Sequence, residues 1–253
     1  MLNKTKVVLV TGGAQRVGAA IVRHLHAQGW TVLVHYRHSS QAATALVAEL
    51  HNIRPMSAFS VYANLDKIEE IDALPKRILE LTGGLDALVN NASTFFATQI
   101  GRASLDDWNN LISSNARAPF FLSQALNQLL QEAHGTIVNI VDIHAQRPFK
   151  QHTIYCMAKA ALQMMTYSLA KELAPKVRVN GVAPGAVLWP EAQTASAIAS
   201  DTQQQILASV PLQRSGCPED IARTVNFLIN DAPYITGQII AVDGGRSHTL
   251  GLE

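Results

Sequence analysis

The chain has 253 residues, of which 48% are hydrophobic and 15% are charged, and its formal net charge is +1. This balance fits a compact globule with a large buried core, and it provides no overall field that would attract nucleic acid or a membrane surface. The two cysteines, Cys156 and Cys217, form no CxxC pair and no HExxH sequence occurs, so we expect neither a disulfide framework nor a bound metal.

The cysteines also bear on location. Two cysteines in a chain without a secretory signal favour the reducing cytoplasm. No apolar stretch reaches the roughly 18 to 20 residues needed to span a bilayer. We therefore expect a cytoplasmic protein that makes no membrane contact.

Short apolar runs alternate with helical segments along the chain. The expected strands are KVVLV (6–10), TVLVHY (31–36), SAFSVYA (57–63), DALVNNA (86–92), TIVNIVD (136–142), VRVNGVAP (177–184) and QIIAVDGG (238–245). Helices are expected at about 17–28, 41–51, 106–132, 153–174 and 219–230. Strands that are apolar on both faces and alternate with helices form covered parallel sheets. The sequence therefore predicts an α/β fold, a single doubly wound Rossmann domain over residues 1–253 with a central, mostly parallel seven-stranded sheet.

One region breaks this alternation. Residues 186–211 are rich in Ala, Ser, Thr and Gln and contain no clear strand. Long irregular loops in compact domains often cover binding sites. We interpret this segment as a substrate lid.

The sequence VTGGAQRVG (10–18) follows the first expected strand. Gly12, Gly13 and Gly18 allow a tight turn and close backbone approach to a phosphate, and the following helix directs its free amides at that phosphate. The spacing is TGxxxRxG rather than GxGxxG. Arg16 is either an exposed loop arginine or a guanidinium that reaches a pyrophosphate or a substrate above it.

The second strand ends in HYRHSS, where NAD-binding proteins often place an acidic residue. Arg37 and His38 bring positive potential instead, and Ser39 is expected to cap the next helix. A cofactor 2′-phosphate would be favoured here, so the sequence indicates NADP(H) over NAD(H). The alternative is a solvated turn that happens to be basic.

Three further motifs follow in order: NNAS (90–93), SSNARAPFF containing Asn115, and YCMAK (155–159). Tyr155 and Lys159 are four residues apart and so share one helix face. The lysine charge can lower the pKa of the phenol and assist its role as a proton donor or acceptor.

With these motifs in this order, the chain resembles the short-chain dehydrogenase/reductase family over almost its entire length. The resemblance implies hydride transfer from nicotinamide, with Tyr155 as proton donor, Lys159 on the ribose hydroxyls and Asn115 in a proton relay. The family also resembles proteins that form homotetramers with their long helices as interfaces, so the resemblance implies a homotetramer. The implied cofactor contacts are Gly12, Arg16, Val17, Gly18, Arg37, His38, Ser39, Asn64, Leu65, Asn91, Ala92, Ser93, Tyr155, Lys159, Pro184 and Gly185.

Asp142 departs from the common family pattern, in which serine polarises a substrate carbonyl. An ionised carboxylate cannot donate that hydrogen bond. The alternative interpretation is that Asp142 caps the following loop. Arg16, HYRHS, NNASTFF, VDIHAQRP and YCMAK together resemble the pteridine reductase branch of the family. That resemblance implies a pterin stacked on Phe95 and contacted by Arg16, Ser93, Asp142 and Tyr155. The alternative for Phe95 is an ordinary core residue.

The sequence therefore predicts an NADPH-dependent reductase of dihydropterins, with dihydrofolate as a further candidate substrate. Two alternatives remain open. One is a 3-oxoacyl or other carbonyl reductase on the same scaffold, which Asp142 and Phe95 disfavour. The other is a non-catalytic NADP-binding regulator, which the complete set of Asn115, Tyr155 and Lys159 disfavours.

Overall fold

The computed structural model describes residues 5–187 and 200–248. Its centre is one sheet of seven parallel strands in the order β3-β2-β1-β4-β5-β6-β7. The strands are β1 (Val7–Val10), β2 (Thr31–Tyr36), β3 (Ala58–Tyr62), β4 (Ala87–Asn90), β5 (Thr136–Ile140), β6 (Arg178–Pro184) and β7 (Ile239–Val242). The predicted doubly wound fold is confirmed, and all the strand pairings are parallel rather than most of them.

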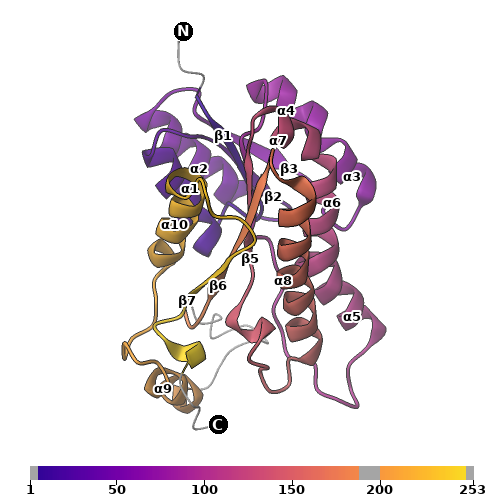
Figure 1. The fold of residues 1–253 in the computed structure, drawn as a ribbon, viewed down its shortest axis with the longest axis vertical. Helices are drawn as coiled ribbons and strands as arrows, with labels where there is room; N and C mark the ends of the chain where they lie inside the picture. The colour runs from indigo at the N-terminus through magenta and orange to yellow at the C-terminus, as the bar shows by residue number, and fades with distance from the viewer. Residues whose placement is uncertain (1–4, 188–199, 249–253) are drawn as a thin grey trace.

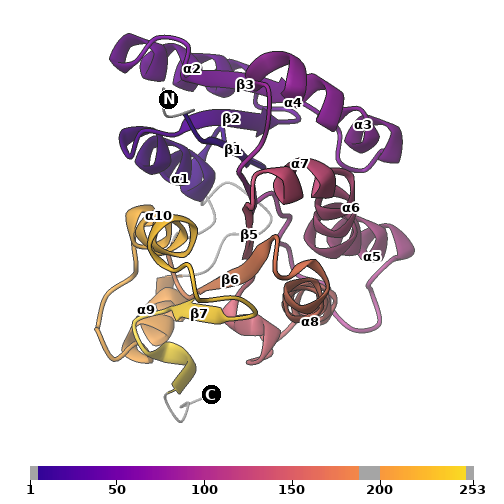
Figure 2. The same cartoon turned by 45° about the horizontal axis from the view of Figure 1, so that its top comes forward.

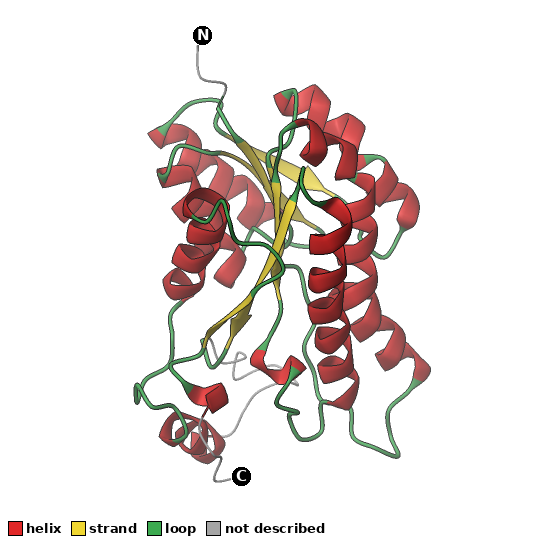
Figure 3. Ribbon diagram, in the orientation of Figure 1, coloured by secondary structure: helices red, strands yellow, loops and turns green. Residues whose placement is uncertain are grey.

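Helices cover both faces of this sheet, as Figures 1 and 2 show. One face carries α1 (Arg16–Ala27), α2 (Ser40–Ile53) and α10 (Pro218–Asn226). The other carries α3 (Ile68–Asp72), α4 (Leu74–Thr82), α5 (Leu105–Ile112), α6 (Ala118–Ala125), α7 (Asn127–Glu132) and α8 (Thr153–Leu173). In Figure 3 the yellow strands run between these two red layers. Among the described helices, none combines the length and apolarity needed to cross a membrane.

The core lies on both sides of the sheet because neighbouring strand residues point to opposite faces. Val8 and Val10 pack with α1, α2 and α10, whereas Val7 and Leu9 pack with the α3–α8 layer. All four side chains are at most 2% exposed. This two-sided burial explains why the strands are apolar runs without alternation in the sequence.

The expected helix over 106–132 is wrong as a continuous element. It consists of α5, a π-helical turn η1 (Ser113–Arg117), α6 and α7. The Asn115 side-chain amide donates to the carbonyl oxygen of Leu111 at 3.0 Å, and Pro119 sits in the first turn of α6. A side chain that bonds to the backbone and a proline without an N–H both interrupt regular helix bonding.

Other boundaries also differ. The expected helix over 219–230 ends at Asn226 and continues as a π-turn, η3 (Phe227–Asp231), and the sequence reading missed α3 and α4. Pro75 lies in the first turn of α4, where proline is compatible with a helix. A sequence interpretation that treats proline as a helix breaker does not predict this helix. The expected lid at 186–211 lies partly outside the described residues, and its second half contains α9 (Ser200–Ala208).

A chain of buried side chains fixes α8 against the middle of the sheet. Asn90 on β4 donates its amide to Asn139 Oδ1 on β5 at 2.8 Å. The Asn139 amide donates to Thr166 Oγ1 on α8, also at 2.8 Å. All three residues are at most 2% exposed. Buried polar groups of this kind destabilise the fold when they lack partners. These two hydrogen bonds therefore specify how β4, β5 and α8 pack together.

Asn139→Ala tests this connection. The variant leaves the buried Asn90 amide without its acceptor and creates a small cavity, so the free energy of unfolding should fall by about 2–4 kcal/mol. Urea unfolding measures the change. Asn109→Ala, an exposed change on α5, is the control and should alter the unfolding free energy by less than about 0.5 kcal/mol. Equal stability of the two variants would contradict the proposed role of Asn139.

Candidate active site

The glycine-rich turn between β1 and α1 is built by backbone contacts that tolerate no side chain. Gly12 has φ +59°, and a Cβ added at Gly18 would overlap the carbonyl oxygen of Gly12. Asn91 braces the turn, because its side-chain amide donates to the carbonyl oxygens of Thr11 at 2.8 Å and Gly12 at 3.2 Å. Arg16 begins α1 with φ +52°, in the left-handed region that usually favours glycine.

His35 holds the same turn from the side of β2. Its Nδ1 accepts the Gly12 N–H at 3.1 Å, and its Nε2 lies 3.0 Å from the carbonyl oxygen of Ala63. Because a carbonyl oxygen only accepts, Nε2 must carry the proton, and the ring is neutral. Burial lowers the pKa of His35 to about 4. The sequence reading missed this residue, which joins the glycine turn to the ends of β2 and β3.

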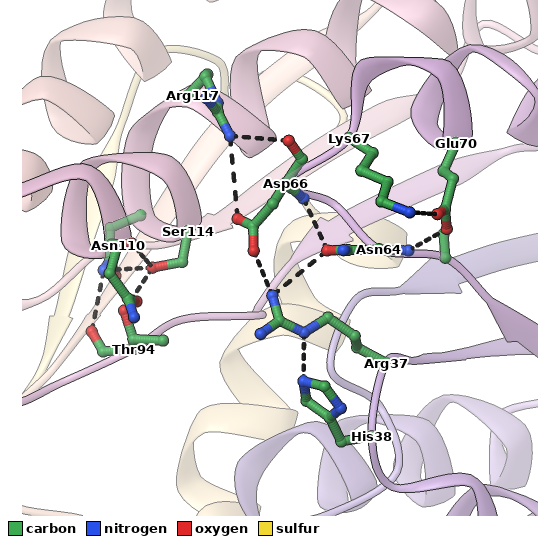
Figure 4. A network of polar contacts seen from close by, with 12 residues as sticks. Arg37, His38, Asn64, Asp66, Lys67, Glu70, Thr94, Asn110, Ser114 and Arg117 are labelled. Carbon is green, nitrogen blue, oxygen red and sulfur yellow. Dashed lines mark hydrogen bonds and ion pairs between the residues drawn. The ribbon is translucent and has the colours of Figure 1, made fainter. Parts of the chain in front are cut away.

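The basic group after β2 forms a cluster with the loop after β3 (Figure 4). The Arg37 guanidinium pairs with the Asp66 carboxylate and donates Nε–H to His38 Nε2 at 2.6 Å. It also lies 3.4 Å from Asn64 Oδ1, which accepts the Asp66 N–H at 3.1 Å. Arg117 reaches the same loop by donating to the carbonyl oxygen of Asp66 at 3.1 Å. The expected positive group is therefore present, but it is already balanced by a carboxylate.

Ser39 differs from its expected role as a helix cap. It occupies the N-cap position of α2 but makes no capping hydrogen bond with its side chain. The hydroxyl instead donates to Gln15 Oε1 in the glycine turn at 3.2 Å. Ser39 therefore links the basic group to the phosphate-binding turn.

Asp142, Tyr155 and Lys159 meet at the carboxyl end of β5. The Tyr155 hydroxyl donates to Asp142 Oδ2 at 2.7 Å, while Asp142 Oδ1 accepts the His144 N–H at 2.8 Å. Lys159 Nζ donates to the carbonyl oxygen of Ile140 at 2.9 Å. Asp142 thus both caps the short helix η2 (Ile143–Ala145) and contacts the tyrosine, so the two interpretations of this residue hold together.

The proton affinities at this end of the site follow from burial. Burial raises the pKa of Tyr155 well above its usual range, and the Asp142 carboxylate raises it further. Burial also lowers the pKa of Lys159 to about 8, although the charge of Asp142 opposes that shift. The expectation that Lys159 lowers the pKa of Tyr155 is wrong for this arrangement. The phenol therefore keeps its proton at neutral pH, and the raised pKa makes it a weaker acid than a free tyrosine.

Asn115 lies on the π-turn η1, which packs against α8. Its amide donates to the carbonyl oxygens of Thr94 and Leu111, each at 3.0 Å. Its Oδ1 is buried and has no hydrogen-bond partner in the part of the chain that the structure describes. These bonds tie the loop after β4 to the π-turn, and the relay role of Asn115 stays a prediction.

A cavity of about 520 Å³ connects the glycine turn, the basic cluster and the Asp142–Tyr155 pair. Most residues with an implied role line it: Gly12, Arg16, Val17, Gly18, Arg37, His38, Ser39, Asn91, Ala92, Ser93, Phe95, Asp142, Tyr155, Lys159, Pro184 and Gly185. Asn64 and the predicted catalytic residue Asn115 are not among the lining residues, and Asn64 Oδ1 lies 3.4 Å from the Arg37 guanidinium. The Leu65 side chain packs in the core of the α3–α8 layer, so it lends no support to a side-chain contact with cofactor.

The cavity wall also contains residues that the sequence reading did not identify. His144 and Phe149 come from the loop between β5 and α8, and Ile206 and Arg246 come from α9 and the segment after β7. Their positions depend on loop conformation, and no motif in the sequence marks them. Of these four residues, only His144 could have been predicted from the sequence, because it lies two residues after Asp142.

The cavity fits a nicotinamide dinucleotide by its own geometry. Its volume lies within the usual range of ligand sites. At one end, the closely packed Gly12 and Gly18 leave the start of α1 open to a phosphate. At the other, Lys159 and Tyr155 present an ammonium and a hydroxyl group beside the end of β5.

Comparison with known proteins agrees with this geometry. A family model described as enoyl-(acyl carrier protein) reductase matches residues 12–247. Pteridine reductase 1 of Leishmania tarentolae is 38% identical, over 96% of this chain and 96% of that protein. The chain belongs to the short-chain dehydrogenase/reductase family. The family resemblance drawn from the motifs is thereby confirmed.

Other relatives of this short-chain dehydrogenase/reductase are named for a different activity. The 3-oxoacyl-[acyl-carrier-protein] reductase FabG of Staphylococcus aureus (strain Mu50 / ATCC 700699) is 34% identical, over 96% of this chain and 99% of its own. The 3-oxoacyl-[acyl-carrier-protein] reductase of Synechocystis is 38% identical, over 95% and 96%. The protein is thus an oxidoreductase by family, and its relatives include reductases of two substrate classes.

The neutral His35 makes stability depend on pH. In the unfolded chain His35 takes up a proton near pH 6.5, whereas the folded protein resists protonation down to a pKa of about 4. The unfolded state therefore binds more protons within this window, and folding stability falls as pH drops through it, by up to about 3 kcal/mol. His35→Asn should lose that part of the dependence.

Urea unfolding at several pH values between 7 and 4 measures the effect. For each protein, the free energy of unfolding at each pH is compared with its value at pH 7. The exposed His134, whose φ of +49° asparagine tolerates, provides the control variant His134→Asn. Parallel pH curves for the wild type and His35→Asn would refute the buried neutral histidine.

Proposed function

We propose that this protein is an NADPH-dependent reductase of dihydropterins, with dihydrofolate as a further substrate. The main support is the 2.7 Å hydrogen bond between the Tyr155 hydroxyl and Asp142 Oδ2 on the cavity wall. A carboxylate accepts hydrogen bonds, and a pterin offers amino and ring N–H donors to it. A ketone substrate offers only an acceptor oxygen, which a carboxylate would repel.

Tyr155 and Asp142 divide the work at the reacting end of the substrate. A nicotinamide held in the cavity beside Tyr155 and Lys159 would supply the hydride that reduces a pterin C=N bond at its carbon. The adjacent nitrogen gains a proton as that double bond becomes single. The Tyr155 hydroxyl, which is hydrogen-bonded to Asp142, donates this proton. Asp142 orients the hydroxyl and accepts a substrate N–H. Burial and Asp142 both raise the pKa of Tyr155, which keeps this proton on the phenol until it is transferred.

Phe95 supports a flat substrate. Its ring lies on the cavity wall with its centroid 4.9 Å from that of Tyr155, at an interplanar angle of 82°. An aromatic face beside the proton donor suits a planar heterocycle, which gains from stacking. Arg16 and Ser93 line the same cavity and complete the proposed substrate contacts.

The cofactor proposal rests on the residues after β2. Arg37, His38 and Ser39 line the cavity, and none of them is acidic. A 2′-phosphate on the cofactor would meet a guanidinium there, whereas NADH would offer only hydroxyl groups. This favours NADPH, the cofactor that the sequence also indicates.

Two other functions remain as alternatives. A 3-oxoacyl or other carbonyl reductase is favoured by the 34–38% identity to 3-oxoacyl-[acyl-carrier-protein] reductases. A non-catalytic NADP-binding regulator would bind cofactor without turnover on any substrate. The Asp142–Tyr155 contact argues against both, since neither carbonyl reduction nor simple nucleotide binding requires that carboxylate.

We also retain the proposal of a cytoplasmic homotetramer without nucleic-acid or membrane partners. Phe120 on α6 and Met157 and Met164 on α8 are 42%, 47% and 61% exposed. Large apolar side chains on the outer face of a helical layer suit contact with further copies of the chain. The oligomeric state is measured by light scattering of the purified protein.

Arg37→Asp tests the cofactor proposal. The change removes the guanidinium and places a further carboxylate where the 2′-phosphate would bind, so NADPH should bind roughly 10- to 100-fold more weakly while NADH binding changes little. Fluorescence titration of both cofactors gives the two dissociation constants. Arg102→Asp, an exposed change before α5, serves as the matched control. If the unmodified protein binds NADH as tightly as NADPH, the proposed preference is wrong.

Asp142→Ser tests the substrate proposal, because it restores the hydroxyl that most family members carry. With dihydropterin, kcat/KM should fall by about 10²-fold, while NADPH affinity remains close to the wild-type value. The wild type is first assayed by NADPH oxidation with dihydrobiopterin, dihydromonapterin, dihydrofolate, a quinonoid dihydropterin and an acetoacetyl thioester. Asp72→Ser, on the exposed end of α3, is the control. Turnover of the thioester alone would favour the carbonyl reductase, and turnover of nothing would favour the regulator.

A further inference from the structure

Four aromatic rings form a column beside the candidate active site. The His152 ring stacks on both Phe95 and Phe149, with centroid distances of 4.6 Å to each and interplanar angles of 12° and 28°. His144 stacks on Phe149 at 4.8 Å and 20°. Phe95 and Phe149 are themselves nearly parallel, at 18° and 6.5 Å. The four rings thus lie in nearly parallel planes, in an offset column in which His152 is displaced sideways from the line that joins the Phe95 and Phe149 centroids.

The column joins two loops at the carboxyl end of the sheet. Phe95 belongs to the loop after β4, and the other three rings belong to the loop between β5 and α8, in the lower part of Figure 1. Phe95, Phe149 and His144 line the cavity, and His152 is not among the lining residues. His152 is 9% exposed. It therefore lies behind the wall and touches the two phenyl rings that form it.

Local bonds fix the His152 ring in this position. Its Nδ1 donates to the carbonyl oxygen of Lys150 at 2.8 Å, since a carbonyl can only accept. Its backbone N–H donates to the carbonyl oxygen of Phe149 at 3.1 Å, and its own carbonyl accepts the Cys156 N–H at 2.9 Å. The ring is thereby tied to the first turn of α8, the helix that also carries Tyr155. Burial lowers the pKa of His152, which favours the neutral ring.

This arrangement connects the proton donor to the stacking surface. Tyr155 is one helical turn from His152 and meets Phe95 edge to face, at 82°. His152 packs flat on Phe95, so the phenyl ring is held by two residues of the same helix start. The contacts of His152 and Tyr155 with Phe95 would therefore fix the distance between a substrate stacked on Phe95 and the side chains of Tyr155 and Asp142.

We propose that His152 is a positioning residue that determines specificity for flat heterocyclic substrates by holding the Phe95 ring. This inference rests on the proposed function, because a dihydropterin is the flat substrate in question. His152 does not touch the substrate. Its flat ring keeps Phe95 in the plane that a planar substrate can use, and a non-planar side chain of similar size cannot.

The experiment compares His152→Leu, which fills the space without a flat ring, with His152→Phe, which restores one. His152→Leu should raise the KM for dihydropterin by about tenfold, the loss expected for a disturbed aromatic stack. The kcat and the NADPH dissociation constant should stay close to the wild-type values. His152→Phe should restore most of the wild-type KM. Tyr234→Ala, which removes a fully exposed aromatic ring, is the control.

A double variant tests whether His152 acts through Phe95. Phe95→Ala alone should raise the KM, and adding His152→Leu should raise it little further, because the ring to be held is already absent. Fully additive effects on KM would overturn the inference. An unchanged KM in His152→Leu, or a loss confined to kcat, would overturn it as well.

Failure of the proposed function has a different signature. In that case the wild type does not reduce dihydropterins at all. The same variants are then measured with the substrate that the wild type does reduce. If that substrate is a flat heterocycle, an unchanged KM in His152→Leu overturns the positioning role, and a raised KM that His152→Phe restores supports it. If it is the thioester, a raised KM in His152→Leu overturns the proposed specificity for flat substrates. Urea unfolding of each variant verifies that it is folded under the assay conditions.

Discussion

The position of α8 against β5 is the constraint on which the candidate active site depends. The buried Asn139 amide fixes that position, because it joins Asn90 on β4 to Thr166 on α8 through two hydrogen bonds of 2.8 Å. Tyr155 and Lys159 lie on this helix, and Asp142 follows β5 directly. The short contact between tyrosine and aspartate thus requires helix and strand to keep one register. Buried amides serve this purpose better than apolar contacts, since a shifted helix would leave them without partners.

The sequence allowed the fold and the main residues of the site to be predicted, because both depend on local patterns. Apolar runs and intervening helices indicate a parallel sheet, and the four-residue spacing of Tyr155 and Lys159 requires only a helix. Features that depend on tertiary contacts escaped prediction. The bond that ties Asn115 on the broken helix to the carbonyl oxygen of Thr94 is a tertiary contact, and the neutral His35 arises from burial between two loops. The raised pKa of Tyr155 likewise follows from burial and from Asp142, neither of which the YxxxK spacing reveals.

Asp142 shows why alternative interpretations of one residue need not exclude each other. One carboxylate oxygen accepts a backbone N–H and caps η2, while the other accepts the tyrosine hydroxyl. The cap holds the carboxylate in one orientation and thereby aims its second oxygen at Tyr155. A residue that looks structural from its neighbours in sequence can in this way acquire a chemical role from its neighbours in space. The same holds for His35, whose ring connects three segments and also lines the cavity.

The pairing of Arg37 with Asp66 changes what cofactor recognition means at this end of the cavity. The guanidinium has an anionic partner before any phosphate arrives, and both side chains are 43% exposed. A 2′-phosphate would therefore exchange one anion for another instead of neutralising a solitary charge. Only the difference between the two pairings contributes to affinity. Dissolved ions screen both pairings, so ionic strength should affect this exchange less than it affects an ordinary capture of phosphate by arginine.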